Sequence, residues 1–190
     1  MENKIIDLNL INSLNDIKCA DVIRKRLVNS ALFMVCYDML SESVVDQVKR
    51  FYIIPFSDKK LYFEYEKNYQ YELGKLDTNI IVVSIKWLRN MEAINDDDSE
   101  LMIKYKSIRD EIAHNLSKII FYSNYHCTIK AKDIIDMRNI INKIDSWFIR
   151  EVELPISCID INKFDTDNNK IIPGIVFILD LIIKAGLLSN

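Results

Sequence analysis

Glycine and proline are scarce in this chain, and their scarcity strongly limits the folds open to it. Only 3 of each occur in 190 residues. Sandwiches and barrels of strands need turn residues at short intervals, whereas long helices need few of them. A hydrophobic fraction of 49% also supplies enough apolar side chains for a real core. The sequence therefore predicts one all-α domain, a helical bundle that spans residues 1–190.

Apolar residues at three- and four-residue spacing indicate where the helices lie. Ser41 is expected to cap a second helix after a long first one. The aromatic segment 56–76 has no such spacing and is expected to be irregular or to hold a short hairpin, since Tyr and Phe favour strands. The expected helices cover residues 14–40, 41–51, a stretch from Asp77 or Thr78 to Met91, 101–120, 130–150 and 171–188.

The last of these segments, 171–188, is apolar enough to require a check for membrane insertion. Asp180 and Lys184 lie inside it at i, i+4, where they can pair on one face of a helix. Two charges in the middle of a spanning helix are costly, so we expect a buried or interface helix and no membrane partner. The cysteines include no C-x-x-C pair, which indicates reduced, mostly buried thiols in a cytoplasmic protein.

The overall charge limits how this chain could bind nucleic acid. A net charge of −3 excludes a protein that coats nucleic acid through bulk positive charge, but a small basic cleft remains possible. Arg24-Lys25-Arg26 and Lys49-Arg50 are candidate phosphate contacts, although such charges on helices usually form a solvated face. The aromatic run 62–71 lacks interleaved Arg and carries Glu, so it favours packing over base stacking.

The strongest functional signal is the hexapeptide Arg109-Asp110-Glu111-Ile112-Ala113-His114. It combines a permanently charged guanidinium with an imidazole, which titrates close to neutral pH. On a helical wheel for 101–120, one apolar stripe faces the core, with His114 almost opposite it and Arg109 at its edge. His114 is therefore expected in solvent, and the plain alternative is a surface histidine without function. The stripe consists of Leu101, Tyr105, Ile108, Ile112, Leu116 and Ile119.

These residue types suit RNA cleavage without a metal ion. An imidazole can take the 2′-hydroxyl proton or protonate the leaving 5′-oxygen, and a guanidinium can bind the charged phosphate through two parallel hydrogen bonds. Asp110 lies one turn before His114, in reach to orient the imidazole or raise its pKa. We take Arg109 and His114 as catalytic candidates with Asp110 in support, and we expect no cofactor and no metal ligand.

The spacing of Arg109 and His114 carries a further prediction. Five residues separate them by about 140° on an ideal helix, so they cannot stack like an i, i+4 pair. Two copies of the helix that meet about a two-fold axis would bring an Arg and a His from each subunit into one cleft. Ile103 and Ala113 would suit such a contact. The geometry therefore predicts a homodimer.

Arg109 to His114, an Arg-x4-His pattern with a polar residue directly after the Arg, resembles the signature of the HEPN family. This family consists of small helical domains that include many metal-independent endoribonucleases. The resemblance covers the hexapeptide itself and, as a helical pattern, most of the chain. It implies a site at a homodimer interface with Arg109 and His114 in it, and tRNA, mRNA or rRNA as substrate.

The same resemblance implies a biological setting. Family members are often toxins or phage-defence effectors, and many work with a neutralising partner, so an antitoxin or regulatory protein is a possible partner here. In one branch, a partner nucleotidyltransferase modifies a Tyr two residues after the His. This chain has Leu116 at that position, so the resemblance does not imply that partner. Some members bind only protein or nucleotide. A non-catalytic interaction or nucleotide-binding module is therefore the alternative function.

Overall fold

A computed structural model gives the fold and describes residues 19–53, 71, 79–122, 125, 127, 129–156 and 172–188. Nearly all of these residues are helical, and none of them forms a strand, which confirms the predicted all-α bundle for this part of the chain. Apart from Tyr71, the expected irregular or hairpin segment 56–76 lies outside the described residues. The helices are α2 (Ala20–Ile53), α4 (Ile80–Asn90), α5 (Asp96–Phe121), α6 (Ala131–Phe148), a π-helical turn (Ile149–Glu153), α7 (Leu154–Ile156) and α8 (Gly174–Leu188).

Helix α2 is one unbroken helix of 34 residues, where the sequence predicted two. Ser41 lies inside this helix and does not cap a new one, so that prediction was wrong. The reason is that the buried stripe continues through this position, since Leu40, Val44 and Val48 are all buried. The Ser41 hydroxyl hydrogen-bonds to the side chain of Tyr37 one turn earlier, which satisfies it within the helix.

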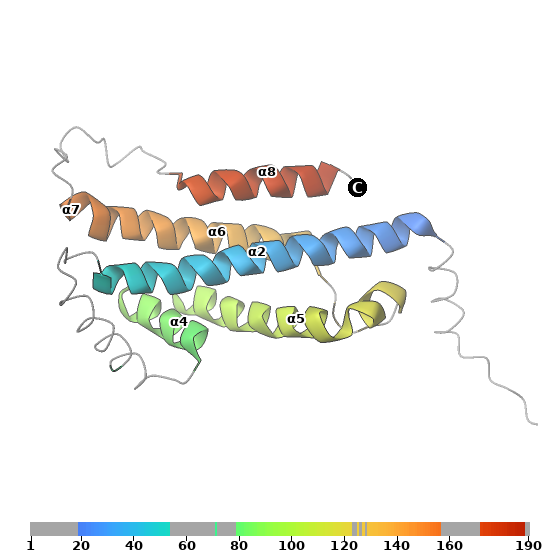
Figure 1. Cartoon of the computed structure of the whole chain (residues 1–190), viewed down its shortest axis with the longest axis horizontal. Helices are drawn as coiled ribbons and strands as arrows, with labels where there is room; N and C mark the ends of the chain where they lie inside the picture. Colours follow the sequence, from blue (N-terminus) through green and yellow to red (C-terminus); the bar gives the residue numbers. More distant parts are fainter. Residues whose placement is uncertain are drawn as a thin grey trace, which may run out of the picture.

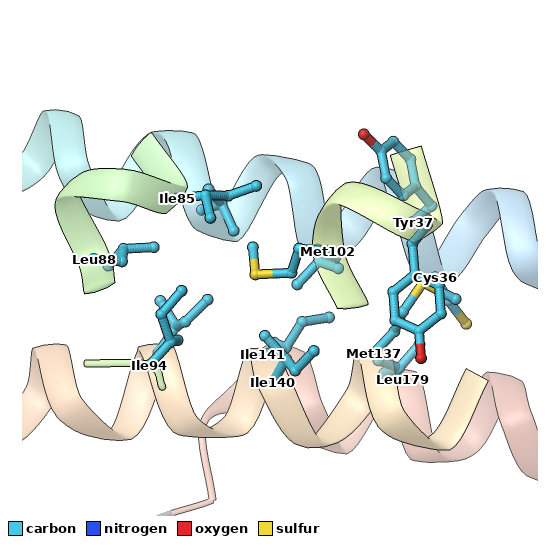
Figure 2. Packing of buried hydrophobic residues seen from close by; sticks show 14 of the residues in the cluster. Cys36, Tyr37, Ile85, Leu88, Ile94, Met102, Met137, Ile140, Ile141 and Leu179 are labelled. Atoms are coloured by element: carbon cyan, nitrogen blue, oxygen red, sulfur yellow. The ribbon is translucent and has the colours of Figure 1, made fainter. Parts of the chain in front are cut away.

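Helix α2 is also the centre of the bundle. It contacts α4, α5, α6 and α8, and in Figure 1 it runs along the length of the molecule with α5 on one side and α8 on the other. The helices share one hydrophobic core, which Figure 2 shows from close by. Each long helix contributes to that core. Examples from the five helices are Phe33, Leu88, Tyr105, Met137 and Leu179.

Apolar residues at three- and four-residue spacing lie on the buried sides of α4 and α6. Val83, Trp87 and Leu88 of α4 are buried, whereas Met91 lies beyond the end of α4 and is 37% exposed. In α4 the N-cap is Asn79 and not Asp77 or Thr78, because the Asn79 carboxamide oxygen accepts hydrogen bonds from the first turn. In α6 the buried apolar residues include Ile134, Met137, Ile141, Ile144 and Phe148.

Helix α8 lies against both α2 and α6. Gly186 faces α2 so closely that a Cβ atom there would lie 2.4 Å from Cδ1 of Leu32. Asp180 pairs with Arg138 of α6, and the expected pair with Lys184 is not formed. Val176 and Leu179 are buried, but the outer side of α8 is apolar and exposed, as expected of an interface helix. No helix in the described part of the chain is both long and apolar enough to span a membrane.

The cysteines differ in their surroundings. Cys36 is buried in the core, Cys127 is half-buried and Cys19 is exposed, while Cys158 lies outside the described residues. Burial raises the pKa of the Cys36 thiol to about 11. The prediction of buried thiols is therefore right for Cys36 and wrong for Cys19.

Candidate functional site

The start of α5 fixes the helix that carries the hexapeptide. Asn95 and Asp98 form a capping box, in which each side chain accepts a hydrogen bond from the backbone N–H of the other residue. Asp98 also binds Lys143 of α6, with Nζ 2.8 Å from Oδ2. Farther along, Tyr105 is fully buried and meets Phe33 of α2 edge to face. These contacts set the rotation of α5 and therefore the direction of the residues that follow.

Arg109 lies on the side of α5 that faces the bundle. Its Nε atom is buried and has no hydrogen-bond partner in the described part of the chain, while its side chain as a whole is 40% exposed. Its guanidinium has one partner among the described residues, because Nη1 donates to Oδ1 of Asp110 at 3.3 Å. That bond is long for a charge-assisted hydrogen bond. Nη2 of Arg109 therefore has no hydrogen-bond partner among the described residues.

Asp110 is held by two cations of its own helix. Lys106, one turn earlier, donates to Oδ2 at 2.9 Å, and Arg109 contacts Oδ1. The hydrogen bond from Lys106 is the main cause that holds the pKa of Asp110 below its ordinary value. The structure thus places Asp110 with Lys106 and Arg109. Its expected role in orienting His114 stays a prediction.

Tyr37 of α2 faces this group of charges. Burial raises the pKa of its phenol, the Asp110 carboxylate raises it further, and the Arg109 guanidinium acts in the opposite direction. Sequence reasoning missed both Tyr37 and Lys106. The i, i+4 spacing of Lys106 and Asp110 could have indicated their ion pair. Nothing in the sequence pointed to Tyr37, which comes from another helix.

His114 lies on the outer side of α5. It is exposed, as the helical wheel predicted, and makes no hydrogen bond or ion pair with any other described residue. Ile103 and Ala113, which were expected on a contact surface, are exposed as well. Within one chain, Arg109 is directed toward the bundle and His114 toward solvent. The structure therefore does not bring the two candidate catalytic residues together in a single copy.

The helix is kinked directly after His114. Asn115 has non-helical backbone angles, φ −128° and ψ 24°. Its side-chain amide donates to Oε1 of Glu111 at 2.9 Å, and the hydroxyl of Tyr125, from the α5–α6 connection, donates to the same oxygen. The kink explains why Leu116 is 40% exposed although its position in the stripe predicted burial. Ile119, the next residue of the stripe, is buried, so the departure from the predicted stripe is local to the kink.

A cavity of about 600 Å³ opens beside α5, and Arg109 is not among the residues that line it. Ammonium groups of Lys104 and Lys130 lie beside the carboxylates of Glu111 and Asp133 there, and Lys104 pairs with Asp133 at 3.3 Å. Ser107 lines the cavity and shares a helix face with His114, seven residues later. The cavity combines residues from two helices and their connection, so no local sequence pattern could have revealed it.

The chain matches no protein-family model, no curated protein and no solved structure. None of these comparisons bears on the resemblance to the HEPN signature, which is carried by the six residues from Arg109 to His114.

Proposed function

We propose that this protein is a metal-independent endoribonuclease of the HEPN type that cleaves cellular RNA as a homodimer. The proposed setting is a cytoplasmic toxin–antitoxin or phage-defence system, with tRNA, mRNA or rRNA as the substrate. One observation carries the proposal. Arg109 keeps a largely unused guanidinium on the same helix that exposes the imidazole of His114.

The proposed chemistry assigns a role to each residue. One imidazole takes the proton of the 2′-hydroxyl, so that the 2′-oxygen attacks phosphorus and forms a 2′,3′-cyclic phosphate. A protonated imidazole gives its proton to the departing 5′-oxygen. Arg109 stabilises the charge that builds up on the phosphoryl oxygens. Asp110 positions the Arg109 guanidinium through its contact with Nη1, and Lys106 in turn holds Asp110.

The proposed dimer follows from the directions of the two side chains. Because Arg109 and His114 diverge within one copy, a complete site needs an Arg and a His from different copies or a change in α5. A second α5 packed against exposed Ile103 and Ala113 would place two such pairs around one axis. A neutralising antitoxin could act by covering the same surface.

The alternative is a non-catalytic module that binds a partner protein. It is favoured by apolar side chains that α5 leaves in solvent: Ile103, Leu116 and Phe121 are each 40% exposed. Exposed apolar residues on one helix are typical of surfaces that bind other proteins. On this reading His114 would be an ordinary surface residue.

The test is cleavage of total RNA and purified tRNA, with EDTA present throughout, by wild type, Arg109→Ala and His114→Ala. We expect discrete fragments with 2′,3′-cyclic phosphate ends from wild type and none from either variant. His114→Ala should keep the fold and the oligomeric state, because the ring is exposed. No cleavage by wild type, or equal cleavage by all three proteins, would overturn the nuclease and favour the binding module.

A further inference from the structure

A second cavity, of about 290 Å³, lies where the start of α2 meets the end of α5. Residues 22, 25, 26, 29 and 30 of α2 line it, and this spacing places them on one helix face. The other side is lined by Ile119, Tyr122, Tyr125, Cys127 and Ile129. The volume is close to the lower end of the range for small-molecule sites, which begins at about 300 Å³.

Two cations stand at this cavity. Arg26 is held in place because its Nη1 atom donates to the backbone oxygen of Ile120 at 2.8 Å, which ties α2 to the last turn of α5. Lys25 lines the cavity, is exposed and forms no ion pair with the other described residues. The cluster Arg24-Lys25-Arg26 is therefore not a uniform solvated face. Two of its three members border a hollow that an anionic group can enter.

The cavity also contains a buried polar group that lacks a partner. Ser30 is only 2% exposed, and its Oγ atom has no hydrogen-bond partner among the residues that the structure describes. Buried hydroxyl groups are nearly always hydrogen-bonded, so an unsatisfied one at the wall of a cavity indicates a missing polar contact. Ser30 can donate to or accept from a ligand that fills the space.

Aromatic and apolar surface completes the site. Tyr122 lines the cavity and is 54% exposed, so its ring is accessible beside the cations. Tyr125 lines it too, and its hydroxyl donates to Glu111 in the wall of the larger cavity. Cys127 lines both cavities, which makes them neighbours. An aromatic ring next to cations is the combination that binds nucleotides, through stacking and phosphate contact.

We infer that this smaller cavity binds one nucleotide, with its base against Tyr122, its phosphate at Lys25 and Arg26, and a polar contact to Ser30. This inference rests on the proposed function in one respect, because it takes the nucleotide to be part of an RNA substrate. A unit of single-stranded RNA bound here would direct the adjoining chain toward the larger cavity beside the hexapeptide helix. Free nucleoside monophosphate offers the same chemistry and is the other source to test.

The test measures binding in the His114→Ala background, so that cleavage does not destroy the probe. A fluorescently labelled single-stranded RNA hexamer is titrated with protein and then displaced by unlabelled hexamer or by nucleoside 5′-monophosphates. Tyr122→Ala and Lys25→Ala should each weaken hexamer binding by about tenfold, the loss expected for one stacked base or a lost phosphate contact. Ser30→Ala should weaken it by a smaller factor.

A matched control is present in the chain. Ser84 is also buried with an unpartnered Oγ, but it belongs to α4 and does not line the cavity, so Ser84→Ala should leave binding unchanged. Displacement by monophosphates at concentrations similar to the hexamer would identify a free nucleotide as the ligand. Displacement by the hexamer alone would identify a unit of RNA.

The inference is overturned if the parent protein binds neither ligand, or if Tyr122→Ala, Lys25→Ala and Ser30→Ala all bind as the parent does. The experiments distinguish a failure of the proposed nucleotide site from a failure of the proposed nuclease activity. Wild type that cleaves RNA while these variants bind normally would contradict the nucleotide site alone. Binding that depends on Tyr122 and Lys25, in a protein whose wild type cuts no RNA, would contradict the nuclease alone.

Discussion

Arg109 and Arg138 have similar local sequences but very different surroundings. Each is followed by a short polar residue, Asp110 or Asn139. Arg138 reaches from α6 to α8, where Nε and Nη2 donate to the two oxygens of Asp180 at 2.8 and 2.7 Å. Arg109 has a single 3.3 Å contact with its own neighbour and a buried Nε atom without a partner. The contrast shows that the residue after an arginine does not determine its role. Arg138 links two helices because a carboxylate on another helix binds it, whereas Arg109 has no such partner among the described residues.

The largest expected difference between Arg109→Ala and Arg138→Ala is in the rate of RNA cleavage. Arg109→Ala is expected to reduce the cleavage rate by about 100-fold or more, because it removes the group that stabilises the charged phosphate. Arg138→Ala should leave the rate within about twofold, a change of only about 0.4 kcal/mol in barrier. Initial rates on one tRNA, with both variants at equal concentration, measure the difference. Equal losses in the two variants would contradict the contrast.

For the free energy of unfolding, we expect Arg138→Ala to have the larger effect and Arg109→Ala the smaller one. Arg138→Ala breaks a bidentate pair between α6 and α8 whose side chains are only 25% and 47% exposed. We expect its free energy of unfolding to fall by about 1–2 kcal/mol, more than for a fully exposed pair. Arg109→Ala should change it by less than about 0.5 kcal/mol. Urea denaturation followed by circular dichroism measures both, and Arg138→Lys tests whether the bidentate geometry matters.

Two glycines test how tightly α8 is packed on its side of the bundle. A Cβ at Gly186 would lie 2.4 Å from a Leu32 side-chain atom, whereas nothing lies within 4 Å of one at Gly174. Gly186→Ala is expected to lower the free energy of unfolding by about 1 kcal/mol, because overpacking outweighs the gain in helix propensity. Gly174→Ala is the control and should be neutral or slightly stabilising. Equal effects in thermal unfolding would show that α8 packs loosely.

Asp145 should show the smallest effect, as a function of pH. It lies on α6, and its Oδ1 atom accepts hydrogen bonds from Ser43 at 2.7 Å and Gln47 at 2.9 Å. Burial is the main cause that raises its pKa. Its contribution to stability is therefore present in acid and is lost as pH rises through the pKa of the folded state.

Asp145→Asn keeps an oxygen that can accept both hydrogen bonds, but the new side chain cannot ionise. Relative to this variant, wild type should lose stability as pH rises above the ordinary Asp pKa of about 4, and the difference should then level off. We expect the change to be about 1 kcal/mol or less between pH 3 and pH 7. Urea unfolding of both proteins at the two pH values measures it. Wild type that gains stability relative to Asp145→Asn between pH 3 and pH 7 would contradict the assigned direction.

Much of the fold could be predicted from the sequence because periodicity and the scarcity of Gly and Pro act locally. The helix predicted for residues 130–150 follows from the spacing of its apolar residues, and the exposure of His114 follows from the helical wheel for 101–120. Interactions between helices could not be predicted in the same way. Asp180 was expected to pair with Lys184 on its own helix, but its partner is Arg138, which lies 42 residues earlier.

In the candidate site, too, the features that depend on contacts between distant residues could not be predicted. The wheel separated Arg109 from His114 correctly, but it placed Leu116 in the core because it assumes a straight helix. The kink arises from Asn115 and from a contact between Glu111 and Tyr125, which is 14 residues farther along the chain. The small cavity joins the start of α2 to the end of α5, and Arg26 and Ile120 are 94 residues apart. No window of sequence contains both halves of such a site.

The central position of α2 has a consequence for how the molecule opens. The side of the bundle with Arg109 and the side with Arg138 both border this one helix, and its core residues pack against the other long helices. Neither side can separate from the rest without uncovering part of α2. Backbone amides near Leu40 should therefore exchange with deuterated solvent only through complete unfolding, whereas those beyond Asn115 can exchange when the end of α5 frays. The two sides differ in chemistry but are held together in one cooperative unit.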